Sequence, residues 1–385
     1  MMRHLLLAIV LLRAIVSVAQ PVVGNEWIDH DRQYWRFDVF QTGLHRLDSA
    51  TLAASGFPVA TVDPADLMLF GKEQQIPIYI EGGDDGVLNA GDFIEFIGRK
   101  NDGWIDERMY TVPQYHANPY YSIFNDTIHY FLTWDPDPLV QKARVLPYVD
   151  PNITAHTVRP WVWGKGTNGY GDVYWYGLLT QDFNYTSGLM LPGEGWGGPG
   201  LITGAANVTA NLFAPTPRAV ASGPPAEVLV VTAGQDIRQY VQPDHHLQLI
   251  AGPTQTVYKD TIFQGNQVIR SRFEMPAADI PAALTVTMQV VHDLPLGNSI
   301  PDYLDFQVGI AMDVTYPRDL QGLGAGPIDL MIPDDPADAS ARLALGGAAS
   351  TPILYCFGDV PRRVVPSEVG SGWELAVPTH PDSAR

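Results

Sequence analysis

The feature that most constrains the fold of this chain is a period-two alternation of apolar and polar residues. In Leu284-Thr-Val-Thr-Met-Gln-Val290 apolar and polar side chains alternate, which is typical of a strand with one buried face. Short strands with turn signals between them predict a β-sandwich, jelly-roll or immunoglobulin-like, over residues 171–318. Its other strands are predicted at residues 227–232, 247–250, 257–263, 268–275 and 304–315.

A smaller N-terminal domain is predicted over residues 25–134, mostly β with one short helix. Asp48 is a good N-cap for a helix at residues 49–55, which Gly56 and Pro58 would end. The fold class predicted for the whole chain is therefore mainly β. The strands of this domain are predicted at residues 34–40, 44–47, 67–70, 76–80 and 93–97.

Two further segments are interpreted as connecting or terminal sequence. Residues 135–170 are rich in Pro and Asp and are predicted to form a connector. Residues 319–385 contain several Gly and Pro residues, and strands are predicted there only at 353–357 and 373–377. We interpret this last block as a linker to a further domain.

The N-terminal residues have the layout of an export signal. Met1-Met-Arg-His4 is a short basic start, residues 5–12 are unbroken apolar sequence, and Ser17-Val18-Ala19 supplies a small-x-small cleavage site. Arg13 interrupts the apolar run, so the run is too short for a permanent membrane anchor. We predict a signal peptide over residues 1–19 and an exported chain without a transmembrane span. Its expected location is the cell surface, the outer membrane or the extracellular space.

Charge and cysteine content narrow the possible partners. The chain has 42 Asp and Glu residues against 23 Lys and Arg residues, a net charge of -19. Such a surface repels nucleic acid and anionic lipid and favours cations, so nucleic acid is excluded as a partner. Cys356 is the single cysteine. No internal disulfide can form, and folding must depend on the β core.

Three consecutive segments carry a family resemblance. They are Gly91-Asp-Phe-Ile-Glu-Phe-Ile-Gly98, Lys100-Asn-Asp-Gly-Trp-Ile-Asp106 and Ser122-Ile-Phe-Asn-Asp-Thr-Ile-His-Tyr-Phe-Leu-Thr-Trp134. In this order they resemble the strand, turn and strand that precede the catalytic domain in gingipain-type cysteine peptidases. The resemblance is strongest to the PorU-like sortases of the type IX secretion system. Residues 37–47 and the strand ending at Arg318 also fit, so the resemblance covers residues 30–320.

The resemblance implies a supporting role for this chain. The complete members of that family are surface cysteine endopeptidases that remove the C-terminal signal of secreted cargo and attach the cargo to anionic lipopolysaccharide. Their catalytic Cys and His belong to a peptidase domain that would begin within residues 319–385. The resemblance therefore implies a chain without catalytic residues, a fragment or the product of a shortened gene. The implied partners are its own downstream peptidase domain if encoded, type IX secretion components at the outer membrane, and secreted cargo proteins.

Cys356 is the one residue that could act as a thiol nucleophile. It lies in Ile353-Leu-Tyr-Cys-Phe357, an apolar strand-like segment in which a buried, inert cysteine is expected. No Gly-rich turn follows it, and the nearest following histidine is His380. We predict that Cys356 is structural and that the chain alone has no peptidase activity.

The acidic stretch Glu81-Gly-Gly-Asp-Asp-Gly-Val-Leu-Asn-Ala-Gly-Asp92 has two interpretations. Read as a calcium loop, it places Gly86 at the sixth position and Asp92 at the last. Gly83 then occupies a ligand position, and Asp92 replaces the usual bidentate Glu. A Gly- and Asp-rich hairpin turn explains the same residues, and we favour it. If a cation such as calcium binds, its expected ligands are Asp84, Asp85, Asn89 and Asp92.

Two further patterns have alternative interpretations. Aromatic residues are dense between residues 161 and 196, which favours a secreted carbohydrate-binding or adhesin-like module as the alternative function. In a sandwich such residues more often fill the core, and we favour that structural interpretation. His245 and His246 are neighbours in a predicted strand, so they should point to opposite faces and cannot hold one metal ion together. The aromatic residues are Trp161, Trp163, Tyr170, Tyr174, Trp175, Tyr176 and Trp196.

Overall fold

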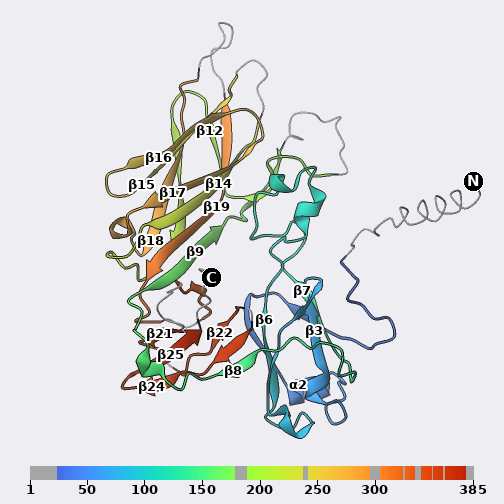
Figure 1. Cartoon of the computed structure of the whole chain (residues 1–385). Helices are drawn as coiled ribbons and strands as arrows, with labels where there is room; N and C mark the ends of the chain where they lie inside the picture. Colours follow the sequence, from blue (N-terminus) through green and yellow to red (C-terminus); the bar gives the residue numbers. More distant parts are fainter. Residues whose placement is uncertain are drawn as a thin grey trace, which may run out of the picture. The chain divides into compact units, whose positions relative to one another are not determined.

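The computed structural model describes residues 24–177, 189–236, 242–294, 304–323, 326–333, 340–348, 350–358 and 360–378. Its regular structure is almost entirely strand, with one α-helix among these residues, so the predicted mainly β fold is confirmed (Figure 1). The predicted signal peptide at residues 1–19 lies outside the described residues. No helix in the described ranges is long and apolar enough to cross a membrane.

The chain divides into two compact units, which are described separately. Unit 1 consists of Met1–Asp38, Leu47–Ile94 and His129–Ala143. Unit 2 consists of Val39–Arg46, Glu95–Ile128 and Arg144–Arg385. The domain boundaries drawn from the sequence stay predictions.

Unit 1 is built on an antiparallel sheet with the strand order β1-β7-β3-β4. Leu67, Leu69 and Leu132 are almost fully buried in it, and the ring of Trp27 stacks on Phe70 with 4.9 Å between centroids. The strand predicted at residues 34–40 is present as β1, whose side chains alternate between half-buried and exposed up to the buried Val39. The strands are β1 (Trp35–Val39), β3 (Leu67–Gly71), β4 (Gln74–Ile76) and β7 (Ile128–Trp134).

The short helix begins where the sequence predicts it. Helix α2 (Ser49–Ala54) is preceded by Asp48, whose carboxylate accepts a hydrogen bond from the Thr51 backbone N–H at 2.7 Å. This contact satisfies one of the amide groups that a helix leaves unpaired at its start. The predicted N-cap is confirmed.

One predicted strand is wrong in its extent. Residues 76–80 were expected to form one strand, but the structure ends β4 at Ile76 and starts β5 (Tyr79–Glu81) after a break. Pro77 lies in the break, and proline has no backbone N–H to donate to a strand ladder. Strand β5 belongs to a separate sheet with the order β2-β6-β5. The other members of that sheet are β2 (Gly43–Asp48) and β6 (Phe93–Gly98).

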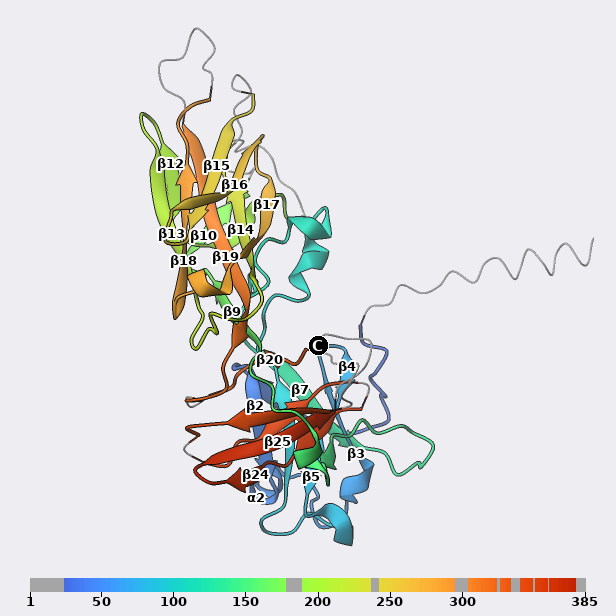
Figure 2. The ribbon, with the colours of Figure 1, turned by 60° about the vertical axis from the view of Figure 1, so that its left-hand side comes forward.

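Unit 2 contains the β-sandwich, whose two sheets form two layers in both views (Figures 1 and 2). One sheet has the order β17-β14-β19-β9-β20, with β12 also paired to β19, and the other has the order β13-β18-β15-β16. The strands are β9 (Val162–Gly169), β12 (Gly200–Thr203), β13 (Val208–Pro215), β14 (Ala226–Gly234), β15 (His245–Ala251), β16 (Thr256–Phe263), β17 (Val268–Met275), β18 (Ala283–Val290), β19 (Asp305–Arg318) and β20 (Leu330–Met331).

The sandwich core follows from the alternation in its strands. In β18 the residues Leu284, Val286 and Met288 are buried and belong to the core between the sheets, whereas Thr285 is exposed. The six strands predicted in this region are all present. The structure adds β9, from within the predicted connector 135–170, as a partner of β19.

The C-terminal residues of the chain form small sheets with their own core. Strands β22 and β25 confirm those predicted at 353–357 and 373–377. Leu343, Leu375 and Val377 are almost fully buried in this core. The sheets have the orders β21-β25-β24 and β22-β23-β8. Their strands are β8 (Leu146–Tyr148), β21 (Ser340–Leu345), β22 (Leu354–Cys356), β23 (Arg362–Val364), β24 (Ser367–Val369) and β25 (Gly372–Pro378).

The outer face of the larger sandwich sheet is covered by a loop segment at residues 104–123. The segment contains two 3-10 turns, η3 (Asp106–Met109) and η4 (Pro113–Tyr115). Ala117 of this segment packs with Val231 and Ile310 of the sheet in a separate apolar cluster. Beside it lies the two-stranded sheet of β10 (Val173–Tyr176) and β11 (Glu194–Gly197).

Candidate functional site

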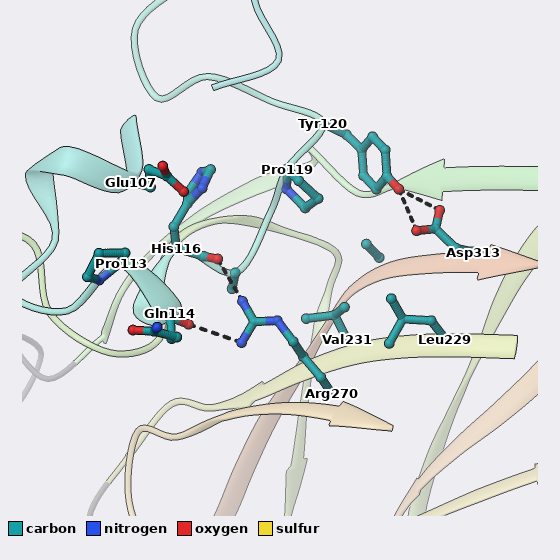
Figure 3. A pocket seen from close by; sticks show the side chains of 12 residues that line it. Glu107, Pro113, Gln114, His116, Pro119, Tyr120, Leu229, Val231, Arg270 and Asp313 are labelled. Carbon is teal, nitrogen blue, oxygen red and sulfur yellow. Dashed lines mark hydrogen bonds between the residues drawn. The ribbon is translucent and has the colours of Figure 1, made fainter. Parts of the chain in front are cut away.

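A cavity of about 400 Å³ lies between the loop segment 104–123 and the outer face of the larger sandwich sheet (Figure 3). This volume is within the range of small-molecule sites in proteins. The sheet contributes residues from β14, β17 and β19, and the segment contributes one wall. The lining residues are Glu107, Pro113, Gln114, His116, Ala117, Pro119, Tyr120, Leu229, Val231, Arg270, Ala311 and Asp313.

The sheet side of the cavity is mostly apolar. Leu229 and Val231 come from β14, two residues apart, so period-two geometry places both on the outer face of the sheet. Ala311 of β19 lies opposite Val231 in the register. The sandwich can bury its inner face and still present this apolar floor, because alternate residues of a strand point to opposite faces.

Arg270 of β17 holds the segment 104–123 against the sheet. Its Nη1 donates to the Gln114 backbone carbonyl at 3.0 Å, and its Nη2 donates to the His116 carbonyl at 2.8 Å (Figure 3). These bonds use two of the five N–H groups of a guanidinium. Both acceptors are neutral, so this cation positions the wall of the cavity through backbone contacts.

Tyr120 and Asp313 form the other polar contact in the cavity. The Tyr120 hydroxyl donates to both carboxylate oxygens of Asp313, at 2.5 and 2.6 Å (Figure 3). Burial raises the pKa of the Tyr120 phenol, and the hydrogen bond to Asp313 raises it further. Tyr120 therefore stays protonated and cannot act as a base near neutral pH.

His116 lies in the wall next to Glu107. Its Nε2 is buried, and among the described residues no partner is within hydrogen-bonding distance of that atom. Burial lowers the pKa of His116, although the charges of Asp106 and Glu107 act in the opposite direction. The ring is therefore neutral near pH 7. One buried oxygen of Asp106, whose side chain is fully inaccessible, also lacks a partner within the described residues.

A second polar cluster lies at one end of the sandwich interior, around His245. Its Nδ1 is 2.6 Å from an oxygen of Asp305, and its Nε2 is 3.1 Å from the Asp236 carbonyl. The Asp244 carboxylate lies 3.5 Å from the same Nε2. His245, Asp244 and Asp305 are all 0% exposed. Both ring nitrogens face acceptors, so the arrangement fits the doubly protonated imidazolium.

Opposing effects act on the pKa of His245. Burial alone lowers it, but the hydrogen bond to Asp305 and the neighbouring carboxylate charges outweigh burial and raise the pKa above its usual value. Asp305 is held in turn by the Gln307 amide, which donates to both of its oxygens. The cluster is one buried imidazolium among carboxylates that also accept hydrogen bonds from amide groups.

His246 faces the other side of β15, as the sequence predicts. Its Nδ1 is 2.6 Å from Asp293 and its Nε2 is 2.8 Å from Asp260, and both of these carboxylates are exposed. Burial lowers its pKa, but the hydrogen bonds to Asp293 and Asp260 raise it above the usual value. Within the described ranges, no group of three or more His, Cys, Asp and Glu side chains could hold a metal ion.

The predicted calcium loop forms a turn that is held by its own hydrogen bonds. Residues Gly83–Asp85 make the 3-10 turn η2, with Gly82 and Gly86 in the left-handed region on either side. Asp85 accepts from the Asn89 amide at 2.6 Å and from the Val87 backbone N–H. Asp92 accepts from the Asn89 backbone N–H at 2.7 Å. These bonds engage carboxylate oxygens of two of the four predicted ligands, Asp85 and Asp92, whereas Asn89 donates in both cases and Asp84 lies exposed beside them. Calcium binding stays a prediction.

Cys356 lies in β22, where the sequence predicts a strand. It is half-buried and packs against the C-terminal core. Burial raises the pKa of its thiol, and the charge of Arg362 offsets this only in part. A thiol with a raised pKa is a poor nucleophile, because the thiolate is the reactive form.

The predicted aromatic segment is used mostly for packing. Trp175 donates its indole N–H to the Gly198 carbonyl, and Trp196 donates to the Ser122 carbonyl. Tyr174 bonds Glu194 at 3.0 Å and packs edge-on against Trp196. Trp161 and Trp163 pack edge to face, and Tyr170 does so with Phe213. Tyr176 is 60% exposed. The carbohydrate-binding alternative stays a prediction.

Sequence reasoning missed several groups of residues that the structure brings together. The wall and floor of the cavity come from distant parts of the chain, and no local spacing signals them. Glu95, in the segment 91–98, is fully buried and binds Arg46, Tyr355 and Arg363. A charged residue inside an otherwise apolar strand was the available signal, because a buried carboxylate requires paired donors.

Comparisons with known proteins show similarity at the level of the fold. No protein-family model matches the chain, and no curated protein matches it. The crystal structure of dimeric latent PorU from Porphyromonas gingivalis matches with a TM-score of 0.51 at 13% identity, over 90% of this chain and 30% of that chain. The infectious bursal disease virus VP2 subviral particle (TM-score 0.22, 13% identity, 74% of this chain and 72% of that chain) and the Gx strain of this virus (TM-score 0.25, 11%, 75% and 74%) also match.

The two viral similarities have TM-scores below 0.5 and carry no argument. The similarity to PorU covers most of the described chain, but the chain spans less than a third of the length of PorU. At this identity the likeness concerns the fold alone. The chain is therefore similar in fold to a mainly β region of PorU.

Proposed function

We propose that this chain is the exported, non-catalytic β region of a PorU-like, gingipain-type cysteine peptidase of the type IX secretion system. The observation that carries the proposal is the fold similarity to PorU over 90% of the chain. The sequence segments 91–98 and 122–134 support it, because they resemble strands of that family and form strands β6 and β7 here. The role is to position or dock a peptidase domain and secretion partners during processing of cargo proteins.

The environment of the single thiol supports a non-catalytic role. Peptide cleavage by cysteine requires a thiolate, a base that takes its proton and donors for the oxyanion. Cys356 lies in a strand and has a raised pKa, so the thiolate is disfavoured. The cavity that lies beside His116 is formed by β14, β17, β19 and the segment 104–123, and Cys356 is not among its lining residues.

A peptidase assay tests the non-catalytic assignment. The purified chain is incubated with fluorogenic peptides that carry Arg, Lys or apolar residues before the scissile bond, before and after alkylation with iodoacetamide. We expect no cleavage above the buffer background in either case. Cleavage that disappears on alkylation, and in a Cys356→Ser variant, would refute the proposal.

Cell fractionation tests export and partnership. An epitope-tagged chain is expressed in its native cells, and intact cells are treated with an external protease before fractionation. We expect the tag in the outer-membrane or medium fraction, protease-accessible, and cross-linked to a cysteine peptidase or to secretion components. Recovery from the cytoplasm alone would contradict export. Surface exposure combined with glycan-array binding that Trp175→Ala or Trp196→Ala abolishes would favour the carbohydrate-binding alternative.

A further inference from the structure

We propose that the cavity beneath the segment 104–123 binds an alkylammonium group, from a lysine side chain of a partner or from a free amine. The inference is independent of the proposed function, because it rests on the lining of the cavity alone. The cavity combines an apolar floor, which suits methylene groups, with carboxylates that suit a positive charge (Figure 3).

The charges around the cavity favour a cation. Glu107 and Asp313 line it with two negative charges, and Arg270 lines it with one positive charge. Asp106 does not line the cavity, but it is a third carboxylate close enough to His116 to raise the pKa of that ring. His116 is neutral near pH 7, so it adds no positive charge. The balance is two net negative charges, in a chain whose net charge is already -19, and this field attracts cations.

The arrangement of Arg270 leaves room for a ligand cation. Its two terminal nitrogens bond the carbonyls of Gln114 and His116, so the guanidinium is directed into the wall (Figure 3). Both carboxylate oxygens of Asp313 accept the Tyr120 hydroxyl. A carboxylate has about four acceptor positions, so Asp313 has capacity for an ammonium N–H. The Tyr120 ring is also among the lining groups and can contribute a cation–π contact.

The dimensions suit a chain of methylene groups that ends in an ammonium. The volume of about 400 Å³ exceeds that of a lysine side chain, so a short amine and flanking peptide atoms both fit. Leu229, Val231 and Ala311 form the floor that such methylenes would contact. Burial of each methylene group favours binding whatever the charge of the probe, so the neutral and charged probes below have carbon chains of the same length.

Calorimetric titration at pH 7 and low salt tests the proposal with matched probes. The purified full chain is titrated with n-butylamine, with n-butanol and with butyrate. We expect n-butylamine to bind about two- to fivefold more tightly than n-butanol, because one partly solvated ion pair, with Asp313 or with Glu107, contributes up to about that factor. Equal affinities for the amine and the alcohol would overturn the proposal, as would tighter binding of butyrate.

A charge-removing variant sharpens the test. Glu107→Gln combined with Asp313→Asn keeps the shapes of both side chains and the acceptor for Tyr120. We expect the affinity for n-butylamine to fall by about two- to fivefold, with n-butanol unaffected. The matched control is Glu227→Gln, an exposed carboxylate on the same strand as Leu229 that pairs with Arg272. Equal losses in the variant and the control would overturn the proposal.

Two further probes distinguish the source of the group. The blocked tripeptide Gly-Lys-Gly is compared with the same peptide carrying norleucine, which lacks the ammonium. Tighter binding of the lysine peptide than of n-butylamine identifies a protein side chain as the ligand, whereas tighter binding of the free amine identifies a small molecule. Equal binding of the lysine and norleucine peptides, together with equal binding of amine and alcohol, would leave no role for the charge and would refute the assignment.

Discussion

Residues 81–92 and the surroundings of His245 both concentrate carboxylates, but they do so in different ways. Asp84, Asp85 and Asp92 are neighbours in the sequence, and the first two are exposed in a turn held by bonds to Asn89 and local backbone N–H groups. Asp244 adjoins His245 and Asp236 lies nine residues before it, whereas Asp305 lies 60 residues after it, and the three carboxylates meet around this one imidazole. They are at most 4% exposed.

The difference shows where a charged side chain strongly affects the free energy of unfolding. In the turn, water screens the carboxylates, so each contributes little to stability. Around His245 the same groups are out of water, and each must be paired because an unpaired buried charge is strongly unfavourable. Sequence spacing draws attention to the first cluster, although the second has more influence on the stability of the sandwich.

The largest expected effect comes from breaking the buried cluster. Asp305→Ala removes the acceptor for His245 Nδ1 and for the His246 backbone N–H. We expect the free energy of unfolding to fall by about 3–5 kcal/mol, the cost of leaving one partner of a buried pair uncompensated. Urea denaturation followed by tryptophan fluorescence measures it.

Asp85→Ala is the matched control for this experiment. It removes a carboxylate of the exposed turn, and we expect a change within about 0.5 kcal/mol. Similar losses in the two variants would contradict the contrast between buried and exposed carboxylates. Asp305→Asn keeps the shape and one acceptor, so its loss should lie between the two.

A pH titration of stability gives the next largest effect. The pKa of His246 is raised in the folded chain. The stability that its ion pairs contribute to the folded state is therefore fully present below the pKa of the unfolded chain, about 6.5, and is lost as the pH rises through the folded pKa. The groups that face it are Asp293 and Asp260. We expect the difference in unfolding free energy between the wild-type chain and His246→Gln to shrink above about pH 6.5, by at most about 1.4 kcal/mol per pH unit.

The sign of this pH dependence is the critical result. The pKa of His245 is raised in the same way. Both the wild-type chain and the His246→Gln variant should therefore lose some stability toward alkaline pH, because both retain His245. A difference between the two proteins that stays constant from pH 6 to 9 would show that His246 does not titrate with folding. A difference that grows with pH would mean that its pKa is lowered.

The smallest expected effect concerns calcium. The ligand oxygens of Asp85 and Asp92 already accept hydrogen bonds within the turn, so we expect 1 mM calcium to shift the midpoint of thermal unfolding by less than about 1 °C, as for a ligand whose Kd exceeds its concentration. Differential scanning fluorimetry with and without a chelator measures the shift. A larger shift that Asp85→Ala abolishes would establish the calcium site.

Much of the fold was predictable because local rules governed it. Period two in residues 284–290 predicted a one-sided strand, and Asp48 predicted the start of the helix through a hydrogen bond to Thr51. Adjacency alone predicted that His245 and His246 face opposite sides. The break at Pro77 was missed, although the missing N–H of proline gave the signal.

The candidate site was not predictable by the same rules. Its floor comes from β14 and β19, and its wall comes from residues 107–120. Arg270 on β17 bonds the backbone of this wall. No spacing in the sequence relates these positions, because their proximity depends on which strands pair and on which loop crosses the outer face of the sheet. The contact of Asp305 with His245, across 60 residues of the chain, was missed for the same reason.

The sequence by itself determined the mainly β class, six strands of the sandwich and the chemical nature of its side chains. These properties depend on backbone propensity and on residues within a few positions of each other. Only the tertiary structure decided which carboxylates lie buried beside an imidazole and which stay in water, and which apolar face of the larger sheet forms a cavity. The physical reason is that burial and pairing are set by contacts between residues far apart in the chain, and the energy of a charge depends on that environment.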